Sequence, residues 1–185
     1  MLMLGFTGTR GVGKSHIANL LEVEFGFTRI HTFGPGKAMC VEYAKHCGID
    51  SHTAYRMVYE DLKDVPHSLM PGDGTMRTFM EDFGKFLGVD QGPDYTMGIE
   101  IRRALAFNPE AKLLVESVVY EADYFRNLGG KIVSIHRPSV AGFIEGKHTD
   151  FAVAAIRSDY SLDNSSNDEL VTHNQISLML DFFGA

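Results

Sequence analysis

Eight residues near the amino terminus have the composition and spacing of a loop that holds phosphate groups. They read GTRGVGKS and match the pattern G-x-x-x-x-G-K-[ST] at every fixed position. Glycines let the backbone N–H groups of such a loop turn inward around a phosphate, where side chains would obstruct them. The lysine of this pattern reaches the β- and γ-phosphates of a nucleotide, and the final hydroxyl binds Mg²⁺. The candidate nucleotide-binding residues are Gly8, Gly11, Val12, Gly13, Lys14, Ser15 and His16.

The segments on either side of this loop have the periodicity that the motif requires. Residues 1–7 form an apolar run that is too short for a helix and suits a buried parallel strand. After the loop, apolar side chains recur at helical spacing from Ile17 to Phe25, and Gly26 ends the pattern. A strand, a glycine-rich loop and a helix are therefore predicted in that order. The alternative is a glycine-rich turn that binds no ligand.

Composition and charge restrict the kinds of partner. The chain has 185 residues, 44% hydrophobic and 22% charged, which is typical of one globular domain with room for an inserted lobe. A net charge of −7 argues against a general nucleic-acid or membrane binder, but not against a small anion held by local cations. Two cysteines cannot form a disulfide framework, and we find neither a secretory pattern nor a membrane-spanning stretch. We therefore expect a cytoplasmic protein.

Extended and helical segments alternate at both ends of the chain, whereas the middle is helical throughout. Further extended segments are predicted at residues 27–33, 112–119, 131–136 and 158–163, while residues 137–157 lack clear periodicity. The order is that of a parallel sheet wrapped by helices. We predict a three-layer α/β fold with about five parallel strands. Its expected parts are a core at residues 1–33 and 111–185 and a helical insertion at about 34–110.

The phosphate-binding loop alone does not distinguish switches, motors and kinases. The chain is too short for most motor cores and lacks a guanine-binding motif of the N-K-x-D type. A helical insertion after the second strand and a loop after the fourth suit a kinase of small molecules. In such a kinase the insertion covers the acceptor, and the loop, here at about residues 138–157, closes over the donor as a lid.

Four further segments follow the loop in a recognisable order. They are FGPGKAMC (33–40), TMRTFMEDFGKFLG (75–88), EADYFRNLGGKIVSIHRP (121–138) and DYSLDNSSNDEL (159–170). The series touches nearly the whole chain and resembles the deoxynucleoside monophosphate kinases of bacteriophages, relatives of dephospho-CoA kinases and adenylate kinases. The resemblance implies a P-loop kinase fold in which ATP, with Mg²⁺, phosphorylates the 5′-phosphate of a deoxynucleotide. It allows a homodimer and implies no nucleic-acid or membrane partner.

The resemblance also implies roles near the transferred phosphoryl group. Lys14 and the loop amides would hold the ATP phosphates, with Ser15 on the metal. Glu116, at the end of the third strand, would lie near Mg²⁺ or the acceptor; the alternative is an ordinary strand-end carboxylate. Arg77 would bind the acceptor phosphate, unless it is a solvated surface arginine. Arg137 would stack on adenine or hold a phosphate.

A second group of implied roles concerns the bases and the lid. Lys37 would approach the acceptor, or it is simply a lysine at a helix start. Glu121 would face the nucleoside, and Asn164 would lie near the adenine. Tyr95 would stack on a base, or it belongs to the core. The candidate lid cations are Lys147 and Arg157.

One departure from the related kinases leaves alternatives open. Where they read Asp-x-Arg-Phe after the third strand, residues 116–120 read ESVVY, so that arginine is missing. An arginine at a phosphoryl-transfer centre can be worth about 10³–10⁵ in rate. Arg10, Arg102 or Arg103 are possible substitutes. The alternatives are a kinase of another small molecule such as dephospho-coenzyme A, a nucleotide-binding protein without turnover, and a regulatory switch.

Overall fold

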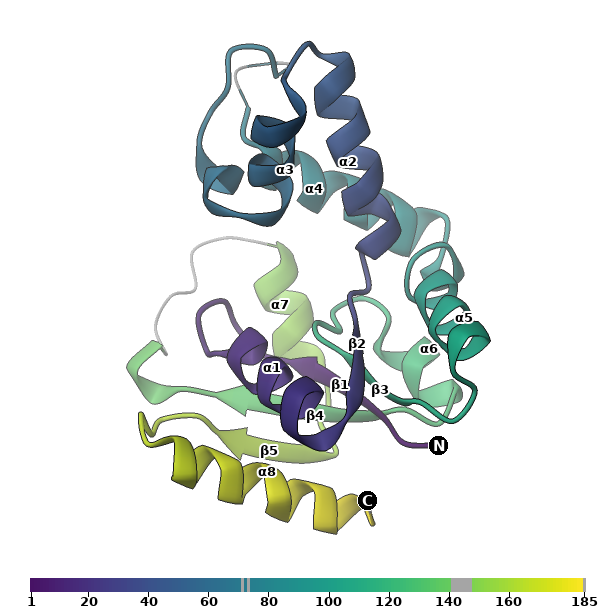
Figure 1. Ribbon diagram of the computed structural model, residues 1–185, viewed down its shortest axis with the longest axis vertical. Coiled ribbons are helices and arrows are strands. Elements are labelled where there is room, and N and C mark those ends of the chain that lie inside the picture. The colour runs from purple at the N-terminus through teal and green to yellow at the C-terminus, as the bar shows by residue number, and fades with distance from the viewer. Residues whose placement is uncertain (71, 73, 141–147, 185) are drawn as a thin grey trace. The chain divides into compact units, whose positions relative to one another are not determined.

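Five short strands form one parallel sheet in the computed structural model, which describes residues 1–70, 72, 74–140 and 148–184. All neighbouring strands pair in parallel, in the order β2-β3-β1-β4-β5 (Figure 1). This confirms the predicted α/β class, with a five-stranded parallel sheet flanked by helices. The strands are β1 (Met3–Thr7), β2 (Phe27–Ile30), β3 (Lys112–Val115), β4 (Lys131–His136) and β5 (Tyr160–Asp163).

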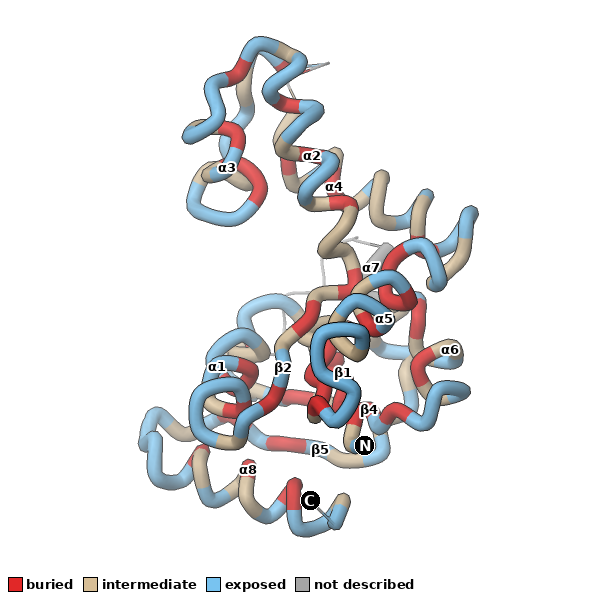
Figure 2. Tube along the Cα trace, turned by 45° about the vertical axis from the view of Figure 1, so that its right-hand side comes forward, coloured by how far each residue is buried: buried red, intermediate tan, exposed pale blue. Residues whose placement is uncertain are grey.

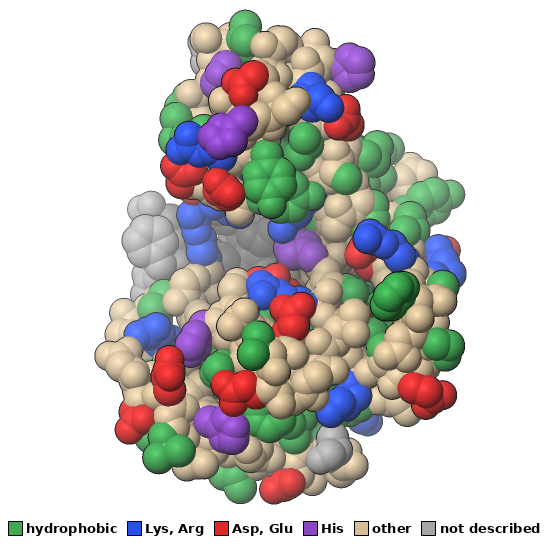
Figure 3. Space-filling model, viewed as in Figure 1, with side chains coloured by type: hydrophobic (Ala, Val, Ile, Leu, Met, Phe, Trp, Pro, Cys, Tyr) green, Lys and Arg blue, Asp and Glu red, His purple; other side chains and the backbone are tan. Residues whose placement is uncertain are grey.

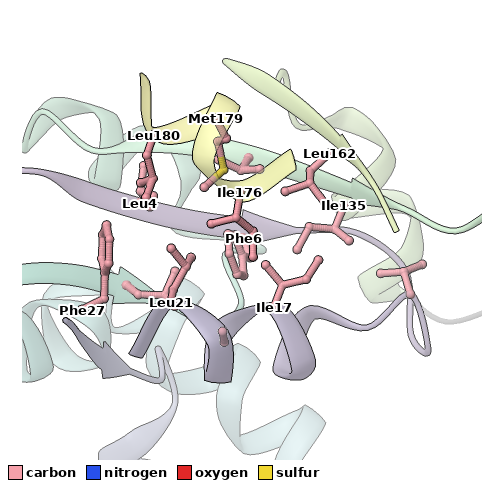
Figure 4. Close-up of a cluster of buried hydrophobic side chains, with 14 residues drawn as sticks. Leu4, Phe6, Ile17, Leu21, Phe27, Ile135, Leu162, Ile176, Met179 and Leu180 are labelled. Atoms are coloured by element: carbon pink, nitrogen blue, oxygen red, sulfur yellow. The ribbon is translucent and has the colours of Figure 1, made fainter. Parts of the chain in front are cut away.

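The central strand β1 is buried at every position, as Figure 2 shows, because helices cover both faces of the sheet. Successive side chains of a strand point to opposite faces. Leu4 and Phe6 point to the face covered by α1 (Lys14–Phe25) and α8 (Glu169–Phe183), where they join one hydrophobic cluster (Figure 4). The helical side chains of this cluster are Ile17, Ala18, Leu21, Ile176, Met179 and Leu180.

The other face of β1 packs against α6 (Ala122–Asn127) through a single aromatic ring. Phe125 is fully buried. A Cβ atom at Gly5, in the middle of β1, would lie 2.7 Å from Cε1 of Phe125 and 2.7 Å from Cγ2 of Val118. Glycine at this position therefore allows the ring to lie directly against the strand, and the ring supplies the volume that a side chain would otherwise fill.

Strands β2 and β3 end earlier than the sequence pattern predicts. The extended segment predicted at residues 112–119 is wrong beyond Val115, and the one predicted at residues 27–33 is wrong beyond Ile30. The N–H of Glu116 still donates to Ile30 O at 3.0 Å, but the N–H of Val118 donates to Phe6 O, at 2.7 Å. The chain therefore turns from β2 toward β1 directly after Glu116, because the apolar side chain of Val118 is buried on the side of β1 that Phe125 covers.

The chain divides into two units. Unit 1 contains the sheet and consists of Met1–Thr32 and Ile101–Ala185, and unit 2 is Phe33–Glu100. Unit 2 is helical, around a cluster of buried side chains from α2, α3 and α4 that includes Cys40, Met57 and Met76. Its elements are α2 (Gly34–His46), α3 (Ser51–Tyr59), η1 (Asp61–Asp64), α4 (Met76–Lys85), η3 (Phe86–Asp90) and η4 (Pro93–Tyr95).

Three further elements complete the described chain. Helix α5 (Met97–Phe107) begins in unit 2 and ends in unit 1. The short turn η5 (Pro138–Val140) and the helix α7 (His148–Ala155) belong to unit 1, and the sequence pattern did not predict α7. Within the described residues, no helix combines the length and apolarity needed to cross a membrane. Acidic and basic side chains are interspersed on the face that Figure 3 shows.

Replacing Phe125 tests how much of the fold depends on its contact with β1. We expect Phe125→Ala to lower the free energy of unfolding by about 3–5 kcal/mol, because it leaves a cavity against Gly5. Phe107→Ala is the matched control, since Phe107 is 93% exposed, and it should change that free energy by less than about 0.5 kcal/mol. Urea unfolding followed by circular dichroism measures both. Equal losses for the two variants would contradict this account of the packing.

Candidate active site

Predicted site residues that follow four of the strands lie at one edge of the sheet. In a parallel sheet all strands end at the same edge, and ligands of open α/β sheets bind there. The loop that contains Gly8 follows β1, and Glu116 follows β3. Arg137 follows β4, and Asn164 follows β5. Four strands thus deliver the candidate residues to a common edge.

The loop between β1 and α1 has the backbone conformation of a phosphate cradle. Gly8 has φ +141° and Gly13 has φ +91°, values that favour glycine. A Cβ atom on Gly8 would also lie 2.6 Å from Ile135 O. Gly13 is the N-cap of α1, and no side chain caps that helix, which leaves its first N–H groups and its positive dipole end for an anion. The loop therefore fits a phosphate group.

Lys14 curls back over this loop. Its Nζ donates to Gly8 O at 2.7 Å and to Thr9 O at 2.9 Å. The ammonium group is half-buried, so its charge is held close to the cradle and not in bulk water. Phosphate oxygens are stronger acceptors for an ammonium group than neutral carbonyls. The arrangement therefore places a cation where the phosphates of a nucleotide would be bound.

Glu116 accepts hydrogen bonds on both carboxylate oxygens. The Ser15 hydroxyl donates to Oε1. Arg29, on β2, donates to Oε2 from Nε at 3.1 Å and from Nη2 at 2.8 Å. Burial acts to raise the pKa of Glu116, but the hydrogen bonds from Ser15 and Arg29, with the charges of Arg29 and His31, outweigh it and hold the pKa below its ordinary value. Glu116 is therefore ionised at neutral pH.

The pair Ser15 and Glu116 fits a magnesium ion shared with a nucleotide. Mg²⁺ prefers oxygen ligands and is usually held by one or two carboxylates together with waters and substrate phosphates. The described residues contain no group of three or more His, Cys, Asp or Glu side chains able to hold a metal by themselves. A hydroxyl and one carboxylate beside a phosphate cradle are the donor set that this shared arrangement needs.

Asn164 ties the segment after β5 to the loop. Its side chain is buried, and Nδ2 donates to Val12 O at 2.8 Å. Its own N–H donates to His136 O at 2.7 Å, so the residue is fixed from both sides. A Cβ atom on Gly13 would overlap Nδ2 of Asn164. The structure thus gives Asn164 a role in shaping the loop, and its place beside an adenine stays a prediction.

Two other predicted residues of unit 1, Arg137 and His16, belong to segments at this edge, whereas Arg157 does not. Arg137 Nη2 donates to Asn167 Oδ1 at 2.9 Å, and His16 is exposed on α1. Arg157 precedes β5, and the N–H of Asp159 beside it donates to Ile132 O near the start of β4, so Arg157 lies at the opposite edge of the sheet from the phosphate cradle. Its side chain is exposed, and its carbonyl accepts from Arg126 Nη2. Lys147, the other predicted lid cation, lies outside the described residues.

Glu121 is a buried carboxyl group with a different environment from Glu116. Only 6% of the residue is exposed, and the N–H of Val119 donates to Oε2 at 3.3 Å. Burial raises the pKa of Glu121, and the backbone N–H groups of residues 119–121 offset only part of that effect. Burial therefore opposes ionisation of Glu121, and its role beside a nucleoside stays a prediction.

Three predicted acceptor-binding residues belong to unit 2. Arg77, on α4, donates from Nε and Nη2 to the two carboxylate oxygens of Asp64, the second bond at 2.9 Å. Lys37 Nζ lies 5.7 Å from the centre of the Tyr59 ring. Tyr95 is 55% exposed, which excludes the core position considered for it. The role of each in acceptor binding stays a prediction.

Unit 2 also contains an apolar pocket of about 600 Å³ between α2 and α4. Two of its aromatic rings, Tyr43 and Phe79, stack with their centres 4.7 Å apart. Lys37, Arg77 and Tyr95 are not among its lining residues, so the pocket and the predicted acceptor site involve different side chains. The lining residues are Ala38, Met39, Glu42, Tyr43, His46, Phe79 and Phe83.

Arg29 and Asp64 were not predicted from the sequence. Arg29 meets Glu116 only because β2 and β3 are neighbours, with Ile30 paired to Val115, and local periodicity does not specify which strands pair. The available signal was a cation within a segment predicted to be extended. Asp64 lies in the short η1 turn, and nothing in its spacing from Arg77 indicates the contact.

Asn164→Ala tests whether the loop needs its tie to the segment after β5. The variant leaves the buried carbonyl of Val12 without the Asn164 donor, which should lower the free energy of unfolding by about 1–3 kcal/mol. We also expect ATP affinity to fall about tenfold, because the cradle is no longer held in shape. Calorimetric titration and urea unfolding measure the two effects. Asn174→Ala, at an exposed position of α8, should change neither; unaltered binding by Asn164→Ala would contradict the proposed tie.

Glu121→Gln tests the raised pKa through the pH dependence of stability. Between the ordinary carboxyl pKa and the raised one, the native protein binds more protons than the unfolded chain, so wild-type stability falls as pH rises through this window. The glutamine side chain does not titrate, so the stability of Glu121→Gln does not fall with pH in this way. The variant should be more stable than wild type at neutral pH, by about 1.4 kcal/mol for each pH unit between the two pKa values, and lose the advantage below about pH 4.3.

Urea unfolding across this pH range provides the measurement for Glu121→Gln. Glu110→Gln, at an exposed position, is the control and should follow wild type at every pH. A stability difference between Glu121→Gln and wild type that does not vary with pH would show that the carboxyl group does not titrate as described.

The chain has matches among solved structures only. No protein-family model matches it, and no curated protein matches it. Among solved structures it is similar to a dephospho-CoA kinase from Campylobacter jejuni, at 13% identity and a TM-score of 0.48, over 97% of this chain and 96% of that one. It is also similar to a shikimate kinase from Bacteroides thetaiotaomicron, at 12% identity and a TM-score of 0.45, over 100% and 99%. Both TM-scores are low, and the fold assignment therefore rests on the strand order and parallel pairing of this chain.

Proposed function

We propose that the protein is an ATP- and Mg²⁺-dependent kinase that phosphorylates a nucleoside monophosphate, with deoxynucleotides as the expected acceptors. In the reaction an oxygen of the acceptor phosphate forms a bond to the γ-phosphorus of ATP. The bond from that phosphorus to the bridging oxygen breaks, and ADP and a nucleoside diphosphate result. The observation that carries the proposal is the loop between β1 and α1, whose Ser15 hydroxyl donates to the ionised Glu116.

Phosphoryl transfer depends mostly on holding two anions in line and neutralising their charge. Lys14 and the N–H groups at the start of α1 bind the donor phosphates in this proposal. Ser15 and Glu116 hold Mg²⁺, which when bound neutralises charge on the phosphate oxygens. Asn164 keeps the loop in the shape that these contacts require.

Arg77 and Lys37 bind the acceptor phosphate in this proposal. Asp64 uses the edge of the Arg77 guanidinium that carries Nε, and so fixes the plane of the group. The edge formed by Nη1 and Nη2 has the fork geometry that suits a phosphate. The Asp64 contact raises the pKa of Arg77 further, so the guanidinium stays charged at every relevant pH.

A nucleotide-binding protein without turnover is the second candidate. The observation in its favour is the segment from Glu116 to Tyr120, which contains no arginine beside the phosphate cradle. A kinase of another small molecule, such as dephospho-coenzyme A, would use the same donor site with a different acceptor. Both candidates share ATP binding with the proposed function and differ from it in the product.

Calorimetric titration with MgATP tests the donor site. Wild type should bind, and Lys14→Ala should bind about 10- to 100-fold more weakly, because the variant loses charged hydrogen bonds worth about 1.5–3 kcal/mol. Lys45→Ala is the control, since Lys45 pairs with Glu42 on the surface of α2, and it should bind like wild type. If the titration of wild type with MgATP gave no heat of binding, the proposal would be overturned.

An ADP-release assay then identifies the acceptor. The panel contains dAMP, dGMP, dCMP, dTMP and dephospho-coenzyme A, and Lys14→Ala serves as the inactive control. ADP formation with at least one deoxynucleotide is the expected result. Turnover of dephospho-coenzyme A alone would replace the acceptor in the proposal. ATP binding without ADP formation from any compound would favour the candidate that lacks turnover.

A further inference from the structure

Arg29 and Glu116 form a partly buried ion pair between neighbouring strands. The side chain of Arg29 is 26% exposed and that of Glu116 is 17% exposed. Both Arg29 donors go to the same oxygen, Oε2, while the Ser15 hydroxyl donates to Oε1. The two carboxylate oxygens therefore have separate partners, one from β2 and one from the start of α1.

This division of partners restricts the orientation of the carboxylate. The terminal torsion of glutamate is broad and roughly two-fold, so a carboxylate bonded to Ser15 alone can rotate and exchange its oxygens. The planar guanidinium of Arg29 donates from two fixed directions to Oε2 and prevents that rotation. Oε1 is consequently kept on the side of the phosphate cradle, where Ser15 lies at the first turn of α1.

Arg29 itself is held in place by the fold. It lies within β2, where the backbone register with β3 pairs Arg29 with Leu114 and Ile30 with Val115. Its Nη1 also lies 4.0 Å from Oε2 of Glu22, on α1. The guanidinium is thus supported by a strand and by the helix that carries Ser15, and its position follows from the packing of the core.

We infer that Arg29 is a positioning residue for the metal-binding pair Ser15 and Glu116. It holds Oε2 of Glu116 so that Oε1 and the Ser15 hydroxyl are presented together to a magnesium ion bound with the nucleotide. The inference rests on the proposed function, because it assigns Arg29 to the same donor site. It differs from a purely structural ion pair, which would stabilise the fold without affecting how the metal contributes to nucleotide binding.

Arg29→Lys and Arg29→Gln test the inference. Lysine keeps the positive charge but cannot donate from two fixed directions, and glutamine keeps a neutral amide NH₂ group as a donor. The control is Arg56→Lys, because Arg56 also donates from Nε and Nη2 to a carboxylate, that of Asp61, on the surface of unit 2. ATP affinity is measured by calorimetry with and without Mg²⁺, and Mn²⁺ binding to the protein–ATP complex is measured by electron paramagnetic resonance.

We expect the Arg29 variants to lose the part of the ATP affinity that Mg²⁺ contributes, and to keep the part that does not need a metal. ATP affinity without metal should stay within about twofold of wild type, while the gain in affinity from Mg²⁺ should fall about tenfold in Arg29→Lys and further in Arg29→Gln. Mn²⁺ affinity should fall in parallel. In kinetic assays the Mg²⁺ concentration for half-maximal rate should rise, with the acceptor KM unchanged. Arg56→Lys should match wild type in each measurement.

Other outcomes separate failure of the inference from failure of the proposed function. If Mg²⁺ raises the ATP affinity of both Arg29 variants as much as that of wild type, Arg29 is only a structural partner of Glu116 and the inference is overturned. The same conclusion follows if ATP affinity falls equally with and without metal. If wild type binds no ATP, or binds it without any effect of Mg²⁺, the proposed function fails. Thermal unfolding of each variant verifies that the folded protein is compared.

Discussion

The parallel pairing of β1 with strands on both of its sides determines where the candidate site lies. β1 is third in the five-strand order, pairs with β3 and β4, and is buried along its whole length. The chain must leave such a strand at the edge where its neighbours also end. The loop that follows is thereby surrounded by Glu116, Arg137 and Asn164, residues that are distant from it in the sequence. Left-handed glycines then let that loop turn back into α1.

Two carboxyl groups near this edge show how the surroundings assign different properties to the same side chain. Glu116 is partly buried but receives a hydroxyl and a guanidinium, and its pKa is lowered. Glu121 is more deeply buried and receives only backbone N–H groups, and its pKa is raised. Groups whose environments push their pKa values apart are suited to different tasks. Glu116 is suited to a cation, whereas burial opposes the charged form of Glu121.

Local patterns predicted much of this fold because the relevant signals are contained within short segments. The apolar run before the loop, the helical spacing from Ile17 to Phe25 and the run at residues 131–136 each identify an element without knowledge of its neighbours. The ends of β2 and β3 and the helix α7 were not predicted correctly. Strand β3 ends at Val115, and the N–H of Val118 then donates a hydrogen bond to Phe6 O, a contact that depends on the order of strands in the sheet. Helix α7 carries no regular apolar stripe that would reveal it.

In the candidate site, too, local patterns identify the residues that are contiguous in the sequence but not the contacts between distant segments. The glycine loop, Lys14 and Ser15 form a contiguous motif, and all the information for that part is local. Arg29 reaches Glu116 across two strands, and Asn164 reaches Val12 from the far end of the chain. Such contacts arise from tertiary packing and leave no periodic trace in the sequence. The roles of Lys37, Arg77 and Tyr95 depend on an acceptor and stay predictions.

The pairing of β1 with β3 also has a consequence for how the protein is made. Met3 pairs with Leu113, so the first strand leaves the ribosome long before its partner has been synthesised. The helices of unit 2 are encoded between them and pack mainly through contacts close in sequence. Chains extend at about 5–20 residues per second, and contacts between distant segments form slowly because a long loop must close. Strand β1 therefore gains its β3 neighbour only after the whole of unit 2 has been synthesised.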